Sequence, residues 1–126
     1  MVHSYAKGYS AERELVHTMA KLGYMTIRAP RSGRINLPSP DVIAVKDGKV
    51  LIFEVKFRAS AFKIEQEQLD ELIAWKEKAG AITYVACKIS RKGWKFLHLH
   101  DVLANKGNIG KKFLEAKGIS LESVCS

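Results

Sequence analysis

Residues 39–56 read SPDVIAVKDGKVLIFEVK and contain two apolar runs joined by an Asp-Gly pair. Such runs on either side of Asp-Gly are typical of a β-hairpin with a two-residue turn. If Asp47 and Gly48 form the turn, the numbers of facing residues sum to 95, so Asp41 faces Glu54. Directly facing residues have Cβ atoms about 4.5–5.5 Å apart. The hairpin therefore predicts two neighbouring carboxylates at its open end.

This carboxylate pair has the composition of a metal site. Like charges at that separation repel unless something positive lies between them, and paired carboxylate oxygens suit Mg²⁺ or Mn²⁺. Lys56 lies on the same strand face as Glu54, because side chains alternate with a period of two. We therefore predict a functional site, formed by these three residues, at the rim of a cleft. The alternative is that Asp41 merely starts a strand after Pro40, with Glu54 and Lys56 on an exposed face, and a one-residue slip of register would separate the pair.

The remaining pattern predicts one α/β domain over residues 1–126, with a central mixed five-stranded sheet flanked by helices. The expected order is αβββαββ plus a C-terminal helical segment, since two helical patterns alternate with short apolar runs. We expect helices over 8–23 and 63–80, strands over 24–30, 41–46, 49–58, 81–89 and 94–100, and a short helix within 108–118.

A third carboxylate, Glu12, lies on the inward face of the first predicted helix. It precedes Leu15, Val16 and Met19 by three, four and seven residues, which places all four on one side. Glu12 is thus a candidate third acidic group of the cleft. Its alternative is a carboxylate that stabilises the helix N-terminus through the helix dipole.

Charge indicates the class of partner. The chain carries a net charge of +8, although residues 65–77 hold five acidic residues and one lysine. Such a positive field favours a polyanion, with DNA or RNA first and an anionic membrane second. An inert basic surface is the alternative. No apolar run is long enough to span a membrane, no signal peptide is evident, and Cys87 and Cys125 read as reduced thiols of a cytoplasmic protein.

Taken in order, Glu12-Arg13-Glu14-Leu15, Pro40-Asp41 and Glu54-Val55-Lys56 resemble the PD-(D/E)xK nuclease superfamily, and more narrowly the archaeal Holliday junction resolvases. The similarity extends to IRAPRSGR, GWKFLHL and GISLESV. It implies a restriction-endonuclease-like fold and a homodimeric, Mg²⁺-dependent endonuclease, with Mn²⁺ able to substitute. Such an enzyme nicks two opposed strands of a four-way DNA junction during recombination and repair, and a sliding clamp or branch-migrating helicase is a family-level partner.

The resemblance also assigns roles. It implies that Asp41, Glu54 and the Val55 carbonyl ligate the metal, with Glu12 completing the acidic site directly or through water. Lys56 would orient the attacking water and stabilise negative charge in the transition state. Ser32 is a further catalytic candidate, at a position similar to a phosphate-contacting residue of the family. Candidate DNA-binding residues are Lys7, Arg13, Arg28, Arg31, Arg34 and Arg58.

Two other functions remain open at this level. One is a different PD-(D/E)xK nuclease, of restriction or repair type, and the other is a non-catalytic, basic DNA-binding module with the same fold. Dimerisation has mild support from the apolar strand at 94–100 and from Phe62 and Trp75, for which burial inside the monomer is the alternative.

Overall fold

Five strands of the described part of the chain form the central sheet, in the order β1-β2-β3-β5-β6. The computed structural model describes residues 2–29 and 37–126, and the side chains from Ser10 onward within the first of these ranges. The elements are α1 (Val2–Lys21), β1 (Met25–Arg28), β2 (Val42–Lys46), β3 (Lys49–Phe57), β4 (Phe62–Lys63), α2 (Gln66–Ala79), β5 (Ile82–Ile89), β6 (Gly93–His98), α3 (Leu99–Ala104), β7 (Asn108–Ile109), α4 (Lys111–Lys117) and α5 (Leu121–Cys125).

The sheet is mixed, as predicted. β3 pairs in parallel with β5, whereas β1–β2, β2–β3 and β5–β6 are antiparallel. A parallel pair needs a crossover connection, and here β4 and α2 supply it between β3 and β5. The longest strand, β3, thus lies in the middle of the sheet and carries the E-x-K segment.

The β2–β3 hairpin has the predicted register, with Lys46 facing Lys49. Asp47 and Gly48 both have positive φ, at 52° and 77°. Two successive positive φ values are those of a type I′ turn, whose twist matches that of the flanking strands. The local turn therefore determines which residues of the two strands face each other.

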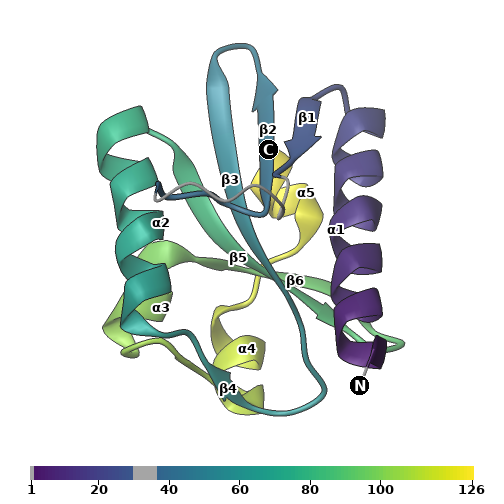
Figure 1. Ribbon diagram of the computed structural model, residues 1–126, viewed down its shortest axis with the longest axis vertical. Coiled ribbons are helices and arrows are strands. Elements are labelled where there is room, and N and C mark those ends of the chain that lie inside the picture. The colour runs from purple at the N-terminus through teal and green to yellow at the C-terminus, as the bar shows by residue number, and fades with distance from the viewer. Residues whose placement is uncertain (1, 30–36) are drawn as a thin grey trace.

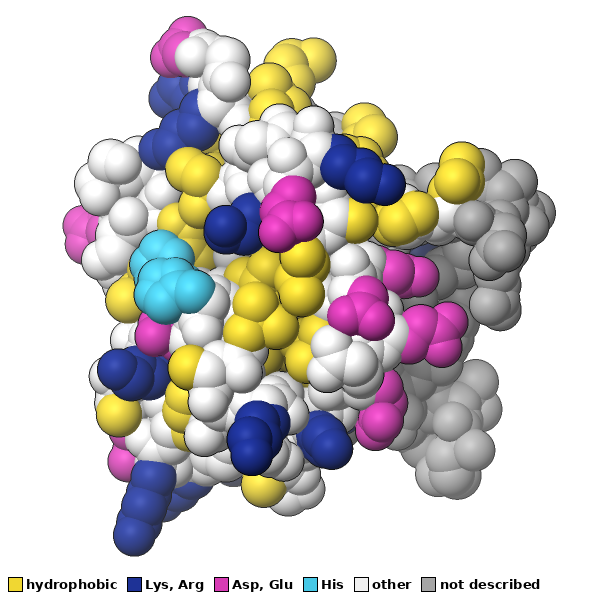
Figure 2. All heavy atoms as spheres, turned by 90° about the vertical axis from the view of Figure 1, so that its left-hand side faces the viewer, with side chains coloured by type: hydrophobic (Ala, Val, Ile, Leu, Met, Phe, Trp, Pro, Cys, Tyr) yellow, Lys and Arg dark blue, Asp and Glu magenta, His cyan; other side chains and the backbone are white. Residues whose placement is uncertain are grey.

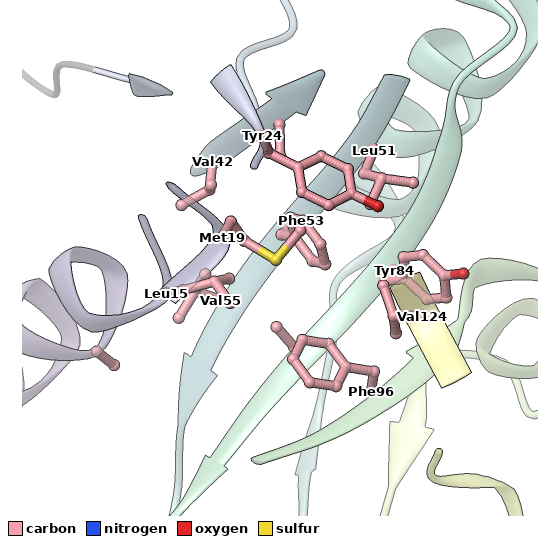
Figure 3. Packing of buried hydrophobic residues seen from close by; sticks show 13 residues of the cluster. Leu15, Met19, Tyr24, Val42, Leu51, Phe53, Val55, Tyr84, Phe96 and Val124 are labelled. Carbon is pink, nitrogen blue, oxygen red and sulfur yellow. The ribbon is translucent and has the colours of Figure 1, made fainter. Parts of the chain in front are cut away.

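Helices cover both faces of the sheet, with α1 on one side and α2 and α3 on the other (Figure 1). On the α1 side, Leu15 and Met19 pack toward Phe53 of β3 (Figure 3). Phe53 stacks on Tyr84 and meets Phe96 edge-on, each with ring centroids 5.8 Å apart. Each such buried side chain stabilises the fold by about 1.5–3 kcal/mol. This core holds α1 against β3.

A second cluster fills the space under α2. Leu69 and Leu72 of α2 pack with Ile52, Val85 and Leu97 of the sheet, and all five are almost fully buried. The apolar positions of α2 recur at helical spacing, so one side of the helix is anchored in the core. α2 is therefore a rigid neighbour of the sheet face on which Glu54 lies.

Several predicted boundaries were wrong. The helix expected over 63–80 begins at Gln66, because Phe62 and Lys63 pair with Asn108 and Ile109 as a small second sheet. The strand expected over 94–100 ends at His98, where α3 begins. The first helix starts earlier than expected, at Val2.

The proposed source of dimer contacts also needs correction. The β6 strand is apolar on both faces because Phe96 and Leu97 are fully buried in the two clusters within the monomer. Phe62 and Trp75 are half-buried and pack against the α2-side cluster. None of the described helices combines the length and apolar character that crossing a membrane requires.

Candidate active site

Asp41 and Glu54 lie on adjacent chain segments at the open end of the hairpin. The Asp41 amide donates to the carbonyl of Phe53 at 3.2 Å, although Phe53 already faces Val42, so the regular β2–β3 pairing ends at Val42. The regular pairs stop at Val42 and Phe53, so the direct facing of Asp41 and Glu54 stays a prediction. Both residues are buried, with exposed fractions of 4% and 7%. Burying two carboxylates is costly unless hydrogen bonds or positive charge compensate, so the burial of both favours a functional site over an exposed strand end.

A backbone hydrogen bond orients Asp41. Its Oδ2 accepts from the Val55 amide at 2.8 Å. This bond takes the place of the next rung of the ladder, because the regular part of β2 begins only at Val42. A short hydrogen bond to a backbone N–H fixes a carboxylate more firmly than a contact with a flexible side chain. Asp41 is therefore held by the same strand that carries Glu54 and Lys56.

Lys56 lies beside Glu54, with its Nζ 3.4 Å from Glu54 Oε2. Gln68 of α2 contacts both groups: its Nε2 donates to Glu54 Oε2 at 3.3 Å, and its Oε1 accepts from Lys56 Nζ at 3.4 Å. Gln68 was not among the residues predicted from the sequence. A signal was present, because Gln68 precedes the inward-facing Leu72 by four residues and is uncharged within an acidic run.

Glu12 is also buried, at 5% exposure, and Arg28 is one of its partners. Arg28 Nε lies 2.8 Å from Glu12 Oε1, which joins the first helix to the end of β1. Arg28 was predicted to hold DNA phosphate, whereas the structure shows it engaged with a carboxylate of the protein.

The described residues do not bring three carboxylate, histidine or cysteine side chains close enough to hold one metal ion. They therefore lend no support to Glu12 as a direct third ligand beside Asp41 and Glu54. A contact of Glu12 through water stays a prediction.

The other predicted residues divide into two groups. Arg13 and Arg58 are exposed, and Arg58 donates to the Phe57 carbonyl at 2.9 Å and lies over the Phe62 ring at 5.5 Å. The Lys7 side chain lies outside the described part of the structure, as do the predicted loop residues Arg31, Ser32 and Arg34.

The donor set fits a hard divalent cation. Carboxylate and carbonyl oxygens are the ligands that Mg²⁺ and Mn²⁺ favour, and the site offers two buried carboxylates with one adjacent ammonium group. Those formal charges sum to −1, so a bound cation would offset the remaining negative charge. The chemistry suits the hydrolysis of a phosphodiester.

Comparisons with known proteins agree with this chemistry. The family model of the archaeal Holliday junction resolvases (Hjc) matches residues 3–126. A relative from Archaeoglobus fulgidus, named crossover junction endodeoxyribonuclease Hjc, is 34% identical over 92 residues, which is 72% of this chain and 68% of the relative. A relative of the same name from Sulfurisphaera tokodaii is 31% identical over 124 residues, or 94% and 85% of the two chains.

The fold comparison gives the same result. The solved structure of Archaeoglobus fulgidus Hjc, a Holliday junction resolvase, superposes with a TM-score of 0.84 at 26% identity and covers 94% of this chain and 100% of that one. Because the family model spans residues 3–126 and the fold superposes on that of a solved member, the chain belongs to the archaeal Holliday junction resolvase family, with its restriction-endonuclease-like fold.

Proposed function

We propose that this chain is a crossover junction endodeoxyribonuclease that resolves four-way DNA junctions by hydrolysing one phosphodiester bond in each of two opposed strands. The observation that carries the proposal is the buried pair of Asp41 and Glu54 with Lys56 alongside. Family membership supports the activity, and the charge of +8 supports a DNA substrate.

The metal-binding residues are the finer part of the proposal. Asp41, Glu54 and the Val55 carbonyl would hold Mg²⁺, with Mn²⁺ able to replace it. When bound, the metal would polarise a phosphoryl oxygen and lower the pKa of a coordinated water. The Val55 amide already orients Asp41, so this carboxylate needs little rearrangement to bind.

Lys56 would act on the phosphate and the water. Its ammonium group is a positive charge that would stabilise the negative charge developing on the phosphoryl oxygens. It would also hold the attacking water by a hydrogen bond. Glu12, held by Arg28 at 2.8 Å, would contact the site through water, and Ser32 stays a catalytic candidate. We further propose that flanking phosphates are bound by Lys7, Arg13, Arg28, Arg31, Arg34 and Arg58.

A homodimer suits a junction cut symmetrically, because two opposed strands require two active sites related by a two-fold axis. Met25 and Ile27 of β1 are 80% and 61% exposed, and the ladder places them on the same sheet face as the 36% exposed Val45. Hydrophobic side chains reach the surface across the side of the molecule shown in Figure 2. An exposed apolar surface of this kind is typical of a protein–protein contact. A sliding clamp or a branch-migrating helicase as a further partner stays a prediction from the resemblance.

Light scattering tests the dimer. We expect the wild-type chain to elute as a dimer and Ile27→Asp to shift it to the monomer mass. Ile82→Asp is the control, because Ile82 is 39% exposed and lies on the opposite face of the sheet. A monomeric wild-type protein, or a dimer unaffected by Ile27→Asp, would contradict this interface.

Nicking of a synthetic immobile four-way junction in Mg²⁺, with the cut positions mapped, tests the activity. Asp41→Asn, Glu54→Gln and Lys56→Ala should each abolish cleavage and leave junction binding nearly unchanged. Asp47→Asn is the matched control, since Asp47 is exposed in a turn whose positive φ asparagine tolerates. An active Asp41→Asn variant would refute the proposal.

The same assay separates the other functions. Equal cleavage of linear duplex would indicate another PD-(D/E)xK nuclease, and junction binding without nicking would indicate a non-catalytic module.

A further inference from the structure

Gln68 closes a triangle of polar contacts with Glu54 and Lys56. Its amide nitrogen lies 3.3 Å from Glu54 Oε2, its amide oxygen lies 3.4 Å from Lys56 Nζ, and that Nζ lies 3.4 Å from the same Glu54 oxygen. We propose that Gln68 is a positioning residue that holds this carboxylate and this ammonium in the arrangement needed to bind a divalent metal and to cleave. The inference rests on the proposed nuclease function.

An amide suits this position better than a charged side chain of similar length. The carboxamide combines a donor and an acceptor, so one end can face the carboxylate while the other faces the ammonium group. A glutamate would repel Glu54, and a lysine or arginine would repel Lys56. The neighbours also determine the orientation of the amide, because an ammonium group can only donate and an ionised carboxylate can only accept.

Gln68 also affects how closely Lys56 approaches Glu54. Unhindered ammonium–carboxylate hydrogen bonds are about 2.7–2.9 Å long, whereas the contact here is 3.4 Å. Because Gln68 contacts both partners, its amide competes with each of them for the hydrogen bond to the other. If Gln68 lost its polar group, Lys56 would move onto the carboxylate and compete with the metal for it.

The helix that carries Gln68 is rigid enough to act as a support. Leu69 and Leu72 anchor α2 in the core, each at 2% exposure. The same helix contacts the segment leading to Asp41, because Trp75 Nε1 donates to the Pro38 carbonyl at 3.3 Å. α2 therefore contacts Glu54 through Gln68 and the segment before Asp41 through Trp75. Supporting residues of this kind, which orient metal ligands without binding the metal, typically change affinity or rate by about 10- to 100-fold when removed.

Gln68→Met tests the inference, because methionine keeps the length and helix preference of glutamine and removes both polar groups. Gln66→Met is the matched control: Gln66 lies two residues earlier in α2, is exposed, and donates to Asp70 at 2.8 Å, away from Glu54. The first readout is Mn²⁺ binding to the free protein, measured by electron paramagnetic resonance. We expect affinity about 10- to 100-fold weaker for Gln68→Met and unchanged affinity for Gln66→Met.

The second readout is single-turnover cleavage of a saturating junction in Mg²⁺, with junction affinity measured separately in Ca²⁺. Gln68→Met should lower the cleavage rate by at least about tenfold and leave the junction Kd and the urea midpoint at the values of Gln66→Met. If Gln68→Met proves unstable, Gln68→Glu replaces it, because glutamate keeps the length and helix preference but cannot donate to Glu54. It too should cleave more slowly.

Different results would contradict the role of Gln68 and the nuclease assignment. Wild-type Mn²⁺ affinity in Gln68→Met, or wild-type cleavage rates in either Gln68 variant, would overturn the role of Gln68 and leave the nuclease assignment intact. A wild-type protein that binds the junction without cutting it would instead overturn the assignment.

Discussion

Arg28→Ala should destabilise the protein through Glu12, before any effect on DNA. Glu12 is almost fully buried, and the guanidinium group of Arg28 contacts it at 2.8 Å. The variant keeps the carboxylate in the protein interior and removes the positive group beside it. The consequence should be visible in the free energy of unfolding, without any substrate present.

The size of the effect follows from the burial of the two side chains, whose exposed fractions are 24% for Arg28 and 6% for Glu12. Two opposite charges about 4 Å apart attract by about 4 kcal/mol at an effective dielectric constant near 20. Desolvation of the carboxylate offsets much of this attraction, and hydrogen bonds to charged groups contribute about 1.5–3 kcal/mol net. We therefore expect a coupling free energy of about 2 kcal/mol between the two residues.

A double-mutant cycle in urea measures this coupling. Arg28→Ala alone should cost about 2–4 kcal/mol, and Arg28→Ala combined with Glu12→Ala should cost about 2 kcal/mol less than the sum of the single variants. Arg58→Ala is the control for losing an exposed arginine, and should cost under about 1 kcal/mol. Strictly additive single effects at residues 12 and 28 would refute the reasoning.

Junction binding by Arg28→Ala adds a second measurement. If Arg28 also contacts phosphate, the slope of log K against log salt should fall by about one unit. An unchanged slope together with a large stability loss would make Arg28 a support for Glu12 alone.

Three further predictions concern packing and the thiols. Gly107→Ala should lower the free energy of unfolding, measured in urea, by more than Gly48→Ala does. Both glycines have positive φ, but a Cβ at residue 107 would lie 2.5 Å from the Ile64 carbonyl oxygen, whereas a Cβ at residue 48 would have nothing within 4 Å. Equal losses of stability would contradict this. Burial raises the pKa of the Cys87 thiol to about 12, and the nearby charge of Lys56 lowers it by less. A thiol reagent at pH 8 should therefore label half-buried Cys125 in the folded protein and reach Cys87 only on unfolding. Equal labelling rates of the two cysteines in the folded protein would contradict this. In the unfolded chain the Cys87 thiol has an ordinary pKa of 9.0, so between pH 9.0 and about 12 it loses its proton there but keeps it in the folded protein. The free energy of unfolding should therefore fall as the pH rises through this range, and Cys87→Ala should reduce that fall.

The sequence by itself determined the features that depend on neighbouring residues. The Asp-Gly turn specified the register, because two residues with positive φ allow few other connections of the strands. The period of two then placed Lys56 on the face of Glu54. Asp41 lies one residue beyond the last regular pair and reaches the same strand through the Val55 amide. The approach of Asp41 to the strand that carries Glu54 was therefore predictable from residues 41–56 alone, whereas the direct facing of the two carboxylates stays a prediction.

Only the tertiary structure decided which distant groups meet this pair. Gln68 reaches Glu54 because Leu69 and Leu72 bury one side of α2 against the sheet, and Arg28 reaches Glu12 because α1 packs beside β1. The small β4–β7 sheet likewise joins segments more than forty residues apart. Turn and strand preferences act over a few residues, whereas the position of one element against another depends on how the whole core packs. That packing, which no single segment encodes, brings Gln68 to the pair.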